Sequence, residues 1–251
     1  MKFLRPLASI LVFLAVWWGI TRFTGIPGFM LPPPLSVAGA LWAQRVLLFY
    51  NSLTTLSEIL LGLVFGTLLG AVSALGIVAS SALQRWLMPI LVLSQAIPVF
   101  ALAPLLVLWL GFGISSKVMM AVLVIFFPIT ANFADGLRRT DPAWLDLART
   151  MNASQFAVMR HVRLPAALPA FASGLRVATA MAPIGAIIGE WVGASSGLGF
   201  VMINANARIQ TSLMFAALVI LAVVAVGLYR LVDVALCRLL YWVPDSTPGG
   251  G

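Results

Sequence analysis

Long apolar stretches alternate with short polar segments along most of the chain. A helix that crosses a membrane needs about 20 mainly apolar residues, and six windows of the sequence meet this requirement. The pattern therefore predicts an all-α membrane protein with about six transmembrane helices. The windows are 5–22, 54–79, 87–110, 118–135, 166–193 and 211–236.

The composition agrees with this class. Of the 251 residues, 62% are hydrophobic and 9% are charged, whereas soluble domains carry about 25% charged residues. Cys237 is the only cysteine and His161 the only histidine, which excludes a disulfide framework and a Cys/His zinc site within one chain. The N-terminus, with Lys2 and Arg5 before an apolar run over 7–20, resembles a signal peptide. No Ala-x-Ala cleavage site follows, so we expect an uncleaved first span.

The chain is expected to form one membrane domain, residues 1–251. Residues 1–30 hold the first span, and 31–53 form a proline-broken and then amphipathic segment outside the cytoplasm. Residues 54–251 hold the core spans and a polar loop at 136–165.

The net charge of +8 is read as membrane topology rather than nucleic-acid binding, because Lys and Arg accumulate in cytoplasmic loops. An even number of spans places both termini on the same side of the membrane. Nine basic residues then lie on that side, and four lie on the other side. Both termini and the 136–165 loop are therefore expected in the cytoplasm. The nine are Lys2, Arg5, Arg85, Arg138, Arg139, Arg149, Arg160, Arg163 and Arg238, and the four are Arg22, Arg45, Lys117 and Arg208.

Small residues recur every four positions within two of the spans. This spacing places them on one helix face, where another helix can approach closely. The sequence leaves open whether the faces pack within or between subunits. The predicted packing glycines are Gly62, Gly66 and Gly70, and Gly185, Gly189 and Gly193.

Polar residues and prolines inside the spans indicate a translocation pathway as one hypothesis. Glu58 and Glu190 are acidic residues in or near the hydrocarbon region, where ionisable groups mark functional sites by default. A carboxyl that bonds a neighbouring helix is the equal alternative. Gln95 and Pro98 join the pathway hypothesis because prolines are expected to break the spans and free backbone groups that cannot face lipid. The breaks are expected at Pro89, Pro98, Pro104, Pro128 and Pro183.

The polar loop predicts a short helix–turn–helix on the membrane surface. Asp141 and Pro142 form a helix start, with aspartate as N-cap and proline at the first position. Asn152 stands where a left-handed turn is expected. By itself, this segment is equally consistent with an inert interfacial loop.

The loop resembles the coupling motif of ABC-importer permeases, in which Glu-Ala-Ala, a Gly and a terminal Leu-Pro follow fixed spacings. The matching residues are Asp146, Leu147, Ala148, Asn152, Val162, Leu164 and Pro165, with Asp in place of Glu and Asn in place of Gly. Segments 94–98, 103–113, 174–176 and 189–199 extend the resemblance to the nitrate/sulfonate/taurine-type permeases over nearly the whole chain.

This resemblance implies a type I importer permease of the bacterial inner membrane that spans it several times and pairs as a homodimer. A periplasmic binding protein would deliver the substrate, and a cytoplasmic ATPase that binds ATP and Mg would dock on loop 141–165. The chain itself would hold no cofactor, and it has no phosphate-binding Gly-x4-Gly-Lys-Ser/Thr loop. Segments 55–58 and 204–208 look closer to the branch that carries pyrimidine precursors of thiamine than to the nitrate and taurine branches.

The substrate could also be an anion such as nitrate or a sulfonate, although a carboxylate such as Glu190 in the pathway would repel it. Two remote alternatives are an intramembrane hydrolase and a passive channel. Gly193-Ala194-Ser195-Ser196-Gly197 fits Gly-x-Ser-x-Gly, but that motif needs a histidine in reach, and His161 is predicted on the other side of the membrane.

Overall fold

The computed structural model describes residues 4–243, and within this range it leaves out the side chains of residues 4–7, 10 and 95. The described residues form helices joined by turns and short loops, and they include no strand. The helices are α1 Leu4–Phe23, α2 Pro34–Ala43, α3 Arg45–Ala79, α4 Ser81–Ala96, α5 Val99–Leu110, α6 Ile114–Arg138, α7 Pro142–Thr150, α8 Gln155–Val158, η1 Met159–Arg163, α9 Leu164–Gly193, α10 Leu198–Ala207 and α11 Thr211–Leu239.

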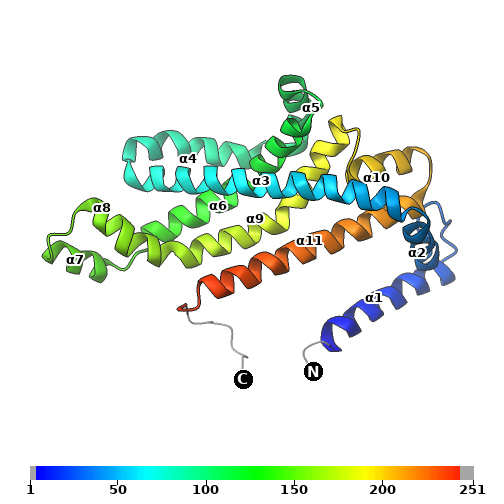
Figure 1. Ribbon diagram of the computed structural model, residues 1–251, viewed down its shortest axis with the longest axis horizontal. Coiled ribbons are helices and arrows are strands. Elements are labelled where there is room, and N and C mark those ends of the chain that lie inside the picture. The colour runs from blue at the N-terminus through cyan, green and yellow to red at the C-terminus, as the bar shows by residue number, and fades with distance from the viewer. Residues whose placement is uncertain (1–3, 244–251) are drawn as a thin grey trace.

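Helix α6 lies at the centre of the bundle, between α3 and α9 (Figure 1). In the most apolar stretch of α6, 56% of the residues are buried inside the protein. The corresponding share for α11 is 11%, so most of α11 is free to face lipid. The core between the three helices contains Ile59, Leu63, Ala121, Ile125, Ile129, Ala178, Ala182 and Ala186. Many of these side chains are small, which suits van der Waals packing between membrane helices.

The predicted packing glycines of α3 and α9 contact other helices of the same chain. A Cβ at Gly66 would lie 2.8 Å from Cγ2 of Ile125, and one at Gly185 would lie 2.7 Å from Cα of Ala121. Glycines of both helices meet Ala121 of α6, which allows α3 and α9 to approach α6 closely. Gly62 and Gly70 face Ala121 and Ile129, Gly189 faces Lys117, and Gly193 faces Val107 of α5.

The number of spans differs from the expected six. Within residues 4–243, four helical stretches are long and apolar enough to cross a membrane, or five if α4 and α5 count as one broken span. They are α3, α6, Gln155–Gly193 and α11. The first expected span corresponds to α1, whose apolar stretch Leu11–Phe23 belongs to the shorter class.

Only one of the five expected proline breaks is present. Helices Ser81–Ser94 and Val99–Leu110 meet at 105°, and Pro98 is the residue before α5. The expected breaks at Pro89, Pro104, Pro128 and Pro183 are wrong, because these residues lie inside continuous helices. Pro128 and Pro183 are buried against neighbouring helices, where protein rather than lipid surrounds the freed backbone groups.

The segment before the second span also differs from the prediction. Helix α3 begins at Arg45 rather than near residue 54, so the amphipathic part of the expected segment 31–53 is divided between α2 and the start of α3. Helices α2 and α10 lie at one end of the long axis, and α7 and α8 at the other (Figure 1).

Candidate functional site

The polar loop forms the predicted helix–turn–helix, beginning with α7. Asp141 is its N-cap, and its Oδ1 accepts a hydrogen bond of 2.9 Å from the amide of Ala143. Pro142 occupies the first turn, where its missing N–H costs no helical hydrogen bond. The helix start predicted from the sequence is thus confirmed.

Helix α7 ends in a turn centred on Asn152, whose φ is 53°. The amide of Ala153 donates to the carbonyl of Ala148 at 3.0 Å, and the amide of Asn152 donates to that of Arg149 at 2.9 Å. These are the two bonds of a Schellman motif, in which Gly or Asn adopts the left-handed conformation. Asn152 therefore adopts the left-handed conformation that was expected at this position.

The next helix begins at Ser154, whose Oγ accepts from the amide of Ala157 at 3.2 Å. Met159–Arg163 then wind as a π-helix, and the amide of Leu164 donates to the carbonyl of Met159. The next residue, Pro165, has no N–H to contribute to the helix. Short π segments are rare and often lie at functional sites. Residues 162–165 form the junction between this π-helix and α9.

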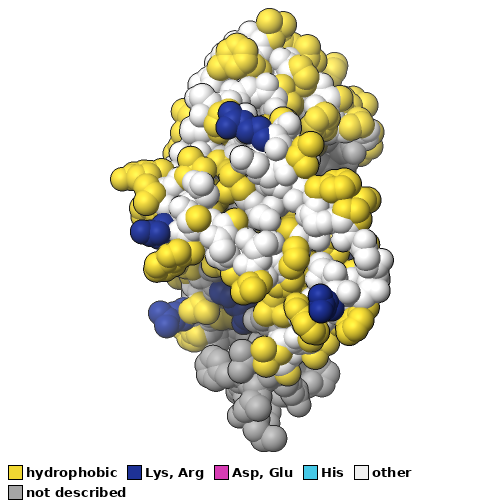
Figure 2. All heavy atoms as spheres, turned by 90° about the vertical axis from the view of Figure 1, so that its right-hand side faces the viewer, with side chains coloured by type: hydrophobic (Ala, Val, Ile, Leu, Met, Phe, Trp, Pro, Cys, Tyr) yellow, Lys and Arg dark blue, Asp and Glu magenta, His cyan; other side chains and the backbone are white. Residues whose placement is uncertain are grey.

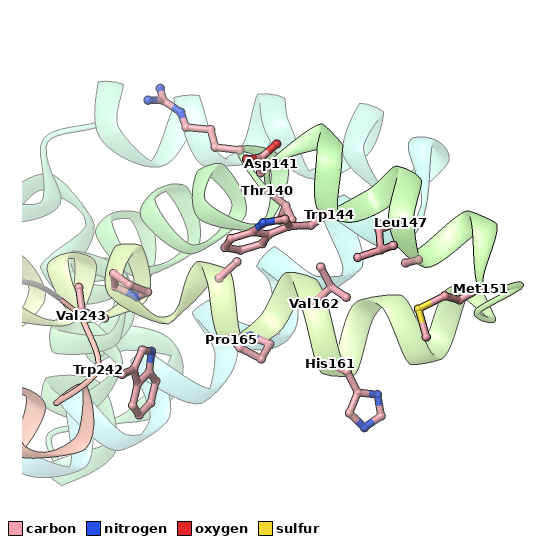
Figure 3. A pocket seen from close by; sticks show the side chains of 14 residues that line it. Thr140, Asp141, Trp144, Leu147, Met151, His161, Val162, Pro165, Trp242 and Val243 are labelled. Carbon is pink, nitrogen blue, oxygen red and sulfur yellow. The ribbon is translucent and has the colours of Figure 1, made fainter.

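An open cavity of about 770 Å³ lies between the loop, the start of α9 and residues 242–243. Figure 3 shows Trp144 and Leu147 of α7 on one side and Val162 and Pro165 on the other, with the His161 ring pointing away from α7. Large apolar side chains of the loop are exposed, namely Trp144, Leu147, Met151 and Phe156. Such a cluster on a rigid helix pair is typical of a protein interaction surface.

Asp146, the residue that replaces Glu in the motif, is exposed on α7. Its Oδ1 lies 2.9 Å from Nη1 of Arg149 on the same helix. Exposed pairs of this kind contribute about 0–1 kcal/mol, so either side chain is free to exchange its partner. Ala148 is buried, while Leu147 and Pro165 are exposed and Val162 and Leu164 are half-buried.

A second polar cluster lies at the opposite end of the bundle, around the start of α10. Glu190 accepts a hydrogen bond of 2.6 Å from the hydroxyl of Thr55 and one of 2.5 Å from the amide of Gly199. Thr55 Oγ1 in turn accepts from the amide of Leu198 at 2.8 Å, and Asn51 Oδ1 accepts from that of Gly197 at 2.7 Å. Side chains of α3 and α9 thus bind the free amides at the start of α10.

Glu58 lies beside this cluster and pairs with Lys117. The Nζ of Lys117 is 3.3 Å from Oε1 of Glu58. Glu58 and Glu190 are 0% and 1% exposed, so neither carboxyl faces solvent in the single chain. Glu190 is held by hydrogen bonds, whereas Glu58 has the Lys117 ion pair and no hydrogen bond among the described residues. This geometry favours the helix-bonding alternative, and the pathway role of Glu58, Glu190 and Pro98 stays a prediction. The side chain of Gln95 lies outside the part that the structure describes.

Thr55, Asn51 and Lys117 were not identified as site residues from the sequence. Asn51, Thr55 and Glu58 follow one another at intervals of four and three residues, which places them on one face of α3. That spacing was the available signal. Lys117 is different, because only the packing of α6 against α3 brings it to Glu58.

The hydrolase alternative fails on geometry. Ser195 follows the end of α9, whereas His161 precedes its start. The intervening helix has 30 residues, which corresponds to about 45 Å at 1.5 Å per residue. The two side chains cannot form a catalytic pair.

The sequence matches known transport proteins over most of its length. Residues 66–239 match the family described as binding-protein-dependent transport system inner membrane component. A probable ABC transporter permease protein of Haemophilus influenzae is 51% identical, over 96% of this chain and 99% of that protein. The formylaminopyrimidine transport permease protein ThiX of Halalkalibacterium halodurans is 37% identical, over 89% of each chain. The riboflavin transport system permease protein RibX of Chloroflexus aurantiacus is 36% identical, over 93% and 88%.

Solved structures have the same fold. A chain of the MetNI methionine ABC transporter in an inward-facing conformation superposes with a TM-score of 0.67. The match covers 81% of this chain and 99% of that one at 20% sequence identity, so it is evidence for the fold alone.

Proposed function

The chain belongs to the family of binding-protein-dependent transport system inner membrane components, and we propose that it is coupled to a separate ATPase through loop 141–165. As a member of this family it is a multi-pass permease subunit of an ABC importer in the inner membrane, and it is not an enzyme. ATP and Mg would be bound by the ATPase, a periplasmic binding protein would deliver the substrate, and a second copy of the chain would complete the pathway.

The capped helix ends of the loop are the observation that carries the coupling proposal. Asp141 and Ser154 cap the two helices, and the Asn152 turn closes the end of α7. A docking element must transmit force without deforming, and three satisfied helix ends provide this stiffness. Leu147, Met151 and Phe156 give the element an exposed apolar surface that a groove of the ATPase would cover.

The orientation follows from the same proposal. With loop 141–165 in the cytoplasm, the excess of basic residues lies on the cytoplasmic side, in agreement with the positive-inside tendency. Helices α2 and α10 then lie at the non-cytoplasmic end, where the binding protein would dock (Figure 1).

For the substrate we favour a small nitrogen heterocycle related to the pyrimidine precursors of thiamine. The relatives named for formylaminopyrimidine and riboflavin transport support this class. Repulsion of anions by Glu190 supports it less than expected, because that carboxyl is buried among its partners. An anion importer of the nitrate, sulfonate or taurine type is the alternative.

Co-purification with the ATPase that we expect to be encoded beside this chain tests the coupling. We expect Asp146→Lys and Asn152→Lys to lose the ATPase or transport, while Gly227→Ala keeps both, because an added Cβ there meets no atom within 4 Å. Unchanged assembly and transport in both loop variants would contradict the coupling proposal. Thermal-shift screening of the neighbouring binding protein with hydroxymethylpyrimidine, riboflavin, taurine and nitrate would identify the substrate class.

A further inference from the structure

The last part of α11 carries three charged side chains, Arg230, Asp233 and Arg238. Residues 211–229, which precede them in the same helix, contain no charged residue. At 1.5 Å per residue this uncharged stretch is about 29 Å long, which matches the hydrocarbon core of about 30 Å. With the orientation proposed above, Arg230 and Asp233 therefore lie where the hydrocarbon meets the headgroups of the cytoplasmic leaflet.

At this level Asp233 forms an ion pair with Arg176 of α9. Nε of Arg176 donates to Oδ1 of Asp233 at 2.7 Å, and Nη2 lies 3.7 Å from Sγ of Cys237. The side chains of Arg176 and Asp233 are 28% and 32% exposed, so the pair lies at the surface of the single chain. These contacts leave Nη1 of Arg176 without a hydrogen-bond partner among the described residues, and it can donate to a group outside the chain.

Arg230 adds a second guanidinium beside this pair. Residues three apart are neighbours on a helix surface, so Arg230 stands next to Asp233. Arg230 is exposed and forms no ion pair within the part of the chain that the structure describes. Two guanidinium groups share one carboxylate here, so the cluster has a positive charge in excess.

The helix face that carries Arg230 is apolar and exposed toward the centre of the membrane. In the most apolar stretch of α11, 11% of the residues are buried. Val226 and Val223 precede Arg230 by four and seven residues, which places them on the same face, and they are 62% and 67% exposed. An acyl chain can lie along these valines while its headgroup reaches the arginines.

Exposed arginines alone do not mark such a site. Figure 2 looks onto the opposite end of the bundle, where α2 and α10 lie, and shows Lys and Arg side chains there as well. The cluster between α9 and α11 differs in two respects. Asp233 holds the guanidinium of Arg176 in place, and an apolar surface that faces lipid adjoins the charges. Together they suit a ligand that has an anionic head and an apolar chain.

We propose that Arg230 and Arg176 bind the phosphate of an anionic phospholipid in the cytoplasmic leaflet, with Asp233 positioning Arg176. The inference rests on the proposed function, which sets the orientation of the chain. Guanidinium groups bind phosphate oxygens through charge-assisted, bidentate hydrogen bonds, and basic sites between membrane helices on the cytoplasmic side bind anionic headgroups. A free phosphate ion offers the same oxygens but gains nothing from the apolar surface of Val223 and Val226.

Native mass spectrometry of the permease–ATPase complex in detergent, titrated with dioleoylphosphatidylglycerol, tests the site. We expect Arg230→Gln to weaken binding about fivefold, the effect of one basic residue at an anionic membrane surface. Arg230→Lys should also weaken it, because lysine keeps the charge but loses the bidentate geometry. Arg238→Gln is the matched control, since it removes an exposed arginine of the same helix that points about 140° away from Asp233. It should bind as wild type does.

Asp233→Asn should act in the opposite direction. The side-chain oxygen of asparagine can still accept from Nε of Arg176, so the guanidinium keeps its place, while the negative charge beside the phosphate is lost. We therefore expect phosphatidylglycerol to bind more tightly than to wild type. A purely structural role of the cluster would instead make Asp233→Asn and Arg230→Gln change binding in the same direction, and this result would overturn the proposal.

The remaining outcomes separate the lipid site from the proposed function. Equal binding by wild type and Arg230→Gln would overturn the site, as expected if a second copy of the chain covered this face. Displacement of phosphatidylglycerol by inorganic phosphate would overturn it in favour of a free anion, and equal weakening by Arg238→Gln would overturn it in favour of general attraction between charged surfaces. A wild-type chain that does not assemble with the ATPase would instead contradict the proposed function.

Discussion

Lys117 on α6 and Glu58 on α3 form a buried ion pair, with Nζ 3.3 Å from Oε1 and side chains only 6% and 0% exposed. Glu190 lies in the same cluster and binds the start of α10. Three spans and a short helix are thus joined by polar contacts at the end opposite loop 136–165. Since an unpaired charge in this setting is costly, each member holds its neighbours in place.

Replacing Lys117 by Met should strongly destabilise the protein, because Glu58 would remain buried without its cation. Breaking a buried pair in this way costs about 3–5 kcal/mol. The double variant Lys117→Met/Glu58→Gln should recover part of this loss, because the uncompensated charge is also removed. Thermal unfolding in detergent measures both effects.

The exposed pair of Asp146 and Arg149 provides the comparison. Arg149→Met should change the midpoint of unfolding very little, as expected for a pair that contributes about 0–1 kcal/mol. Equal destabilisation by Lys117→Met and Arg149→Met would show that the buried cluster has no special structural role.

Thr55→Val should loosen the start of α10. The hydroxyl of Thr55 donates to Glu190 and accepts from the amide of Leu198, and valine fills nearly the same volume without either bond. Each buried polar group left without a partner costs about 1–3 kcal/mol. Hydrogen exchange of peptides covering 197–207 should accelerate.

Ser57→Ala is the control for this experiment, because Ser57 bonds only the carbonyl of Thr54 within its own helix. Exchange over 197–207 should match the wild type. If Thr55→Val left this exchange unchanged, the start of α10 would not depend on the hydroxyl.

The sequence was sufficient to predict the class of fold and the helix–turn–helix of loop 136–165. Apolar windows locate most of the long helices, and the loop is governed by local rules. Asp141 caps because its carboxylate reaches an amide two residues ahead, and Asn152 turns because it tolerates a positive φ. Such features depend on neighbours in the chain, so they can be predicted without knowledge of the tertiary structure.

The proline breaks and the buried cluster could not be predicted in the same way. Pro128 and Pro183 remain inside continuous helices because their surroundings are protein, and this depends on which helix packs against which face. Lys117 reaches Glu58 only after α6 is placed between α3 and α9. Both features depend on tertiary packing, which local patterns do not encode.

Asn152 should be replaceable by Gly but not by Val. The left-handed conformation costs an L-residue roughly 1–2 kcal/mol, which Gly avoids and a β-branched side chain raises. Asn152→Gly should therefore keep ATPase assembly and substrate-stimulated ATP hydrolysis, while Asn152→Val should lower both. Similar hydrolysis in the two variants would mean that the conformation of this turn does not limit coupling.

Gly185→Ala tests whether α9 depends on its close approach to α6. The added Cβ would lie 2.7 Å from Cα of Ala121 and 3.2 Å from the Met120 carbonyl oxygen. Because backbone atoms cannot rotate away, the helices must separate, and overpacking of this kind costs about 1–3 kcal/mol. Gly227→Ala on α11 adds the same methyl group where no atom lies within 4 Å, so its unfolding temperature should equal or exceed that of the wild type. Equal unfolding temperatures for the two variants would contradict tight packing between α9 and α6, since the same chemical change would then have the same effect in a packed face and in an open one.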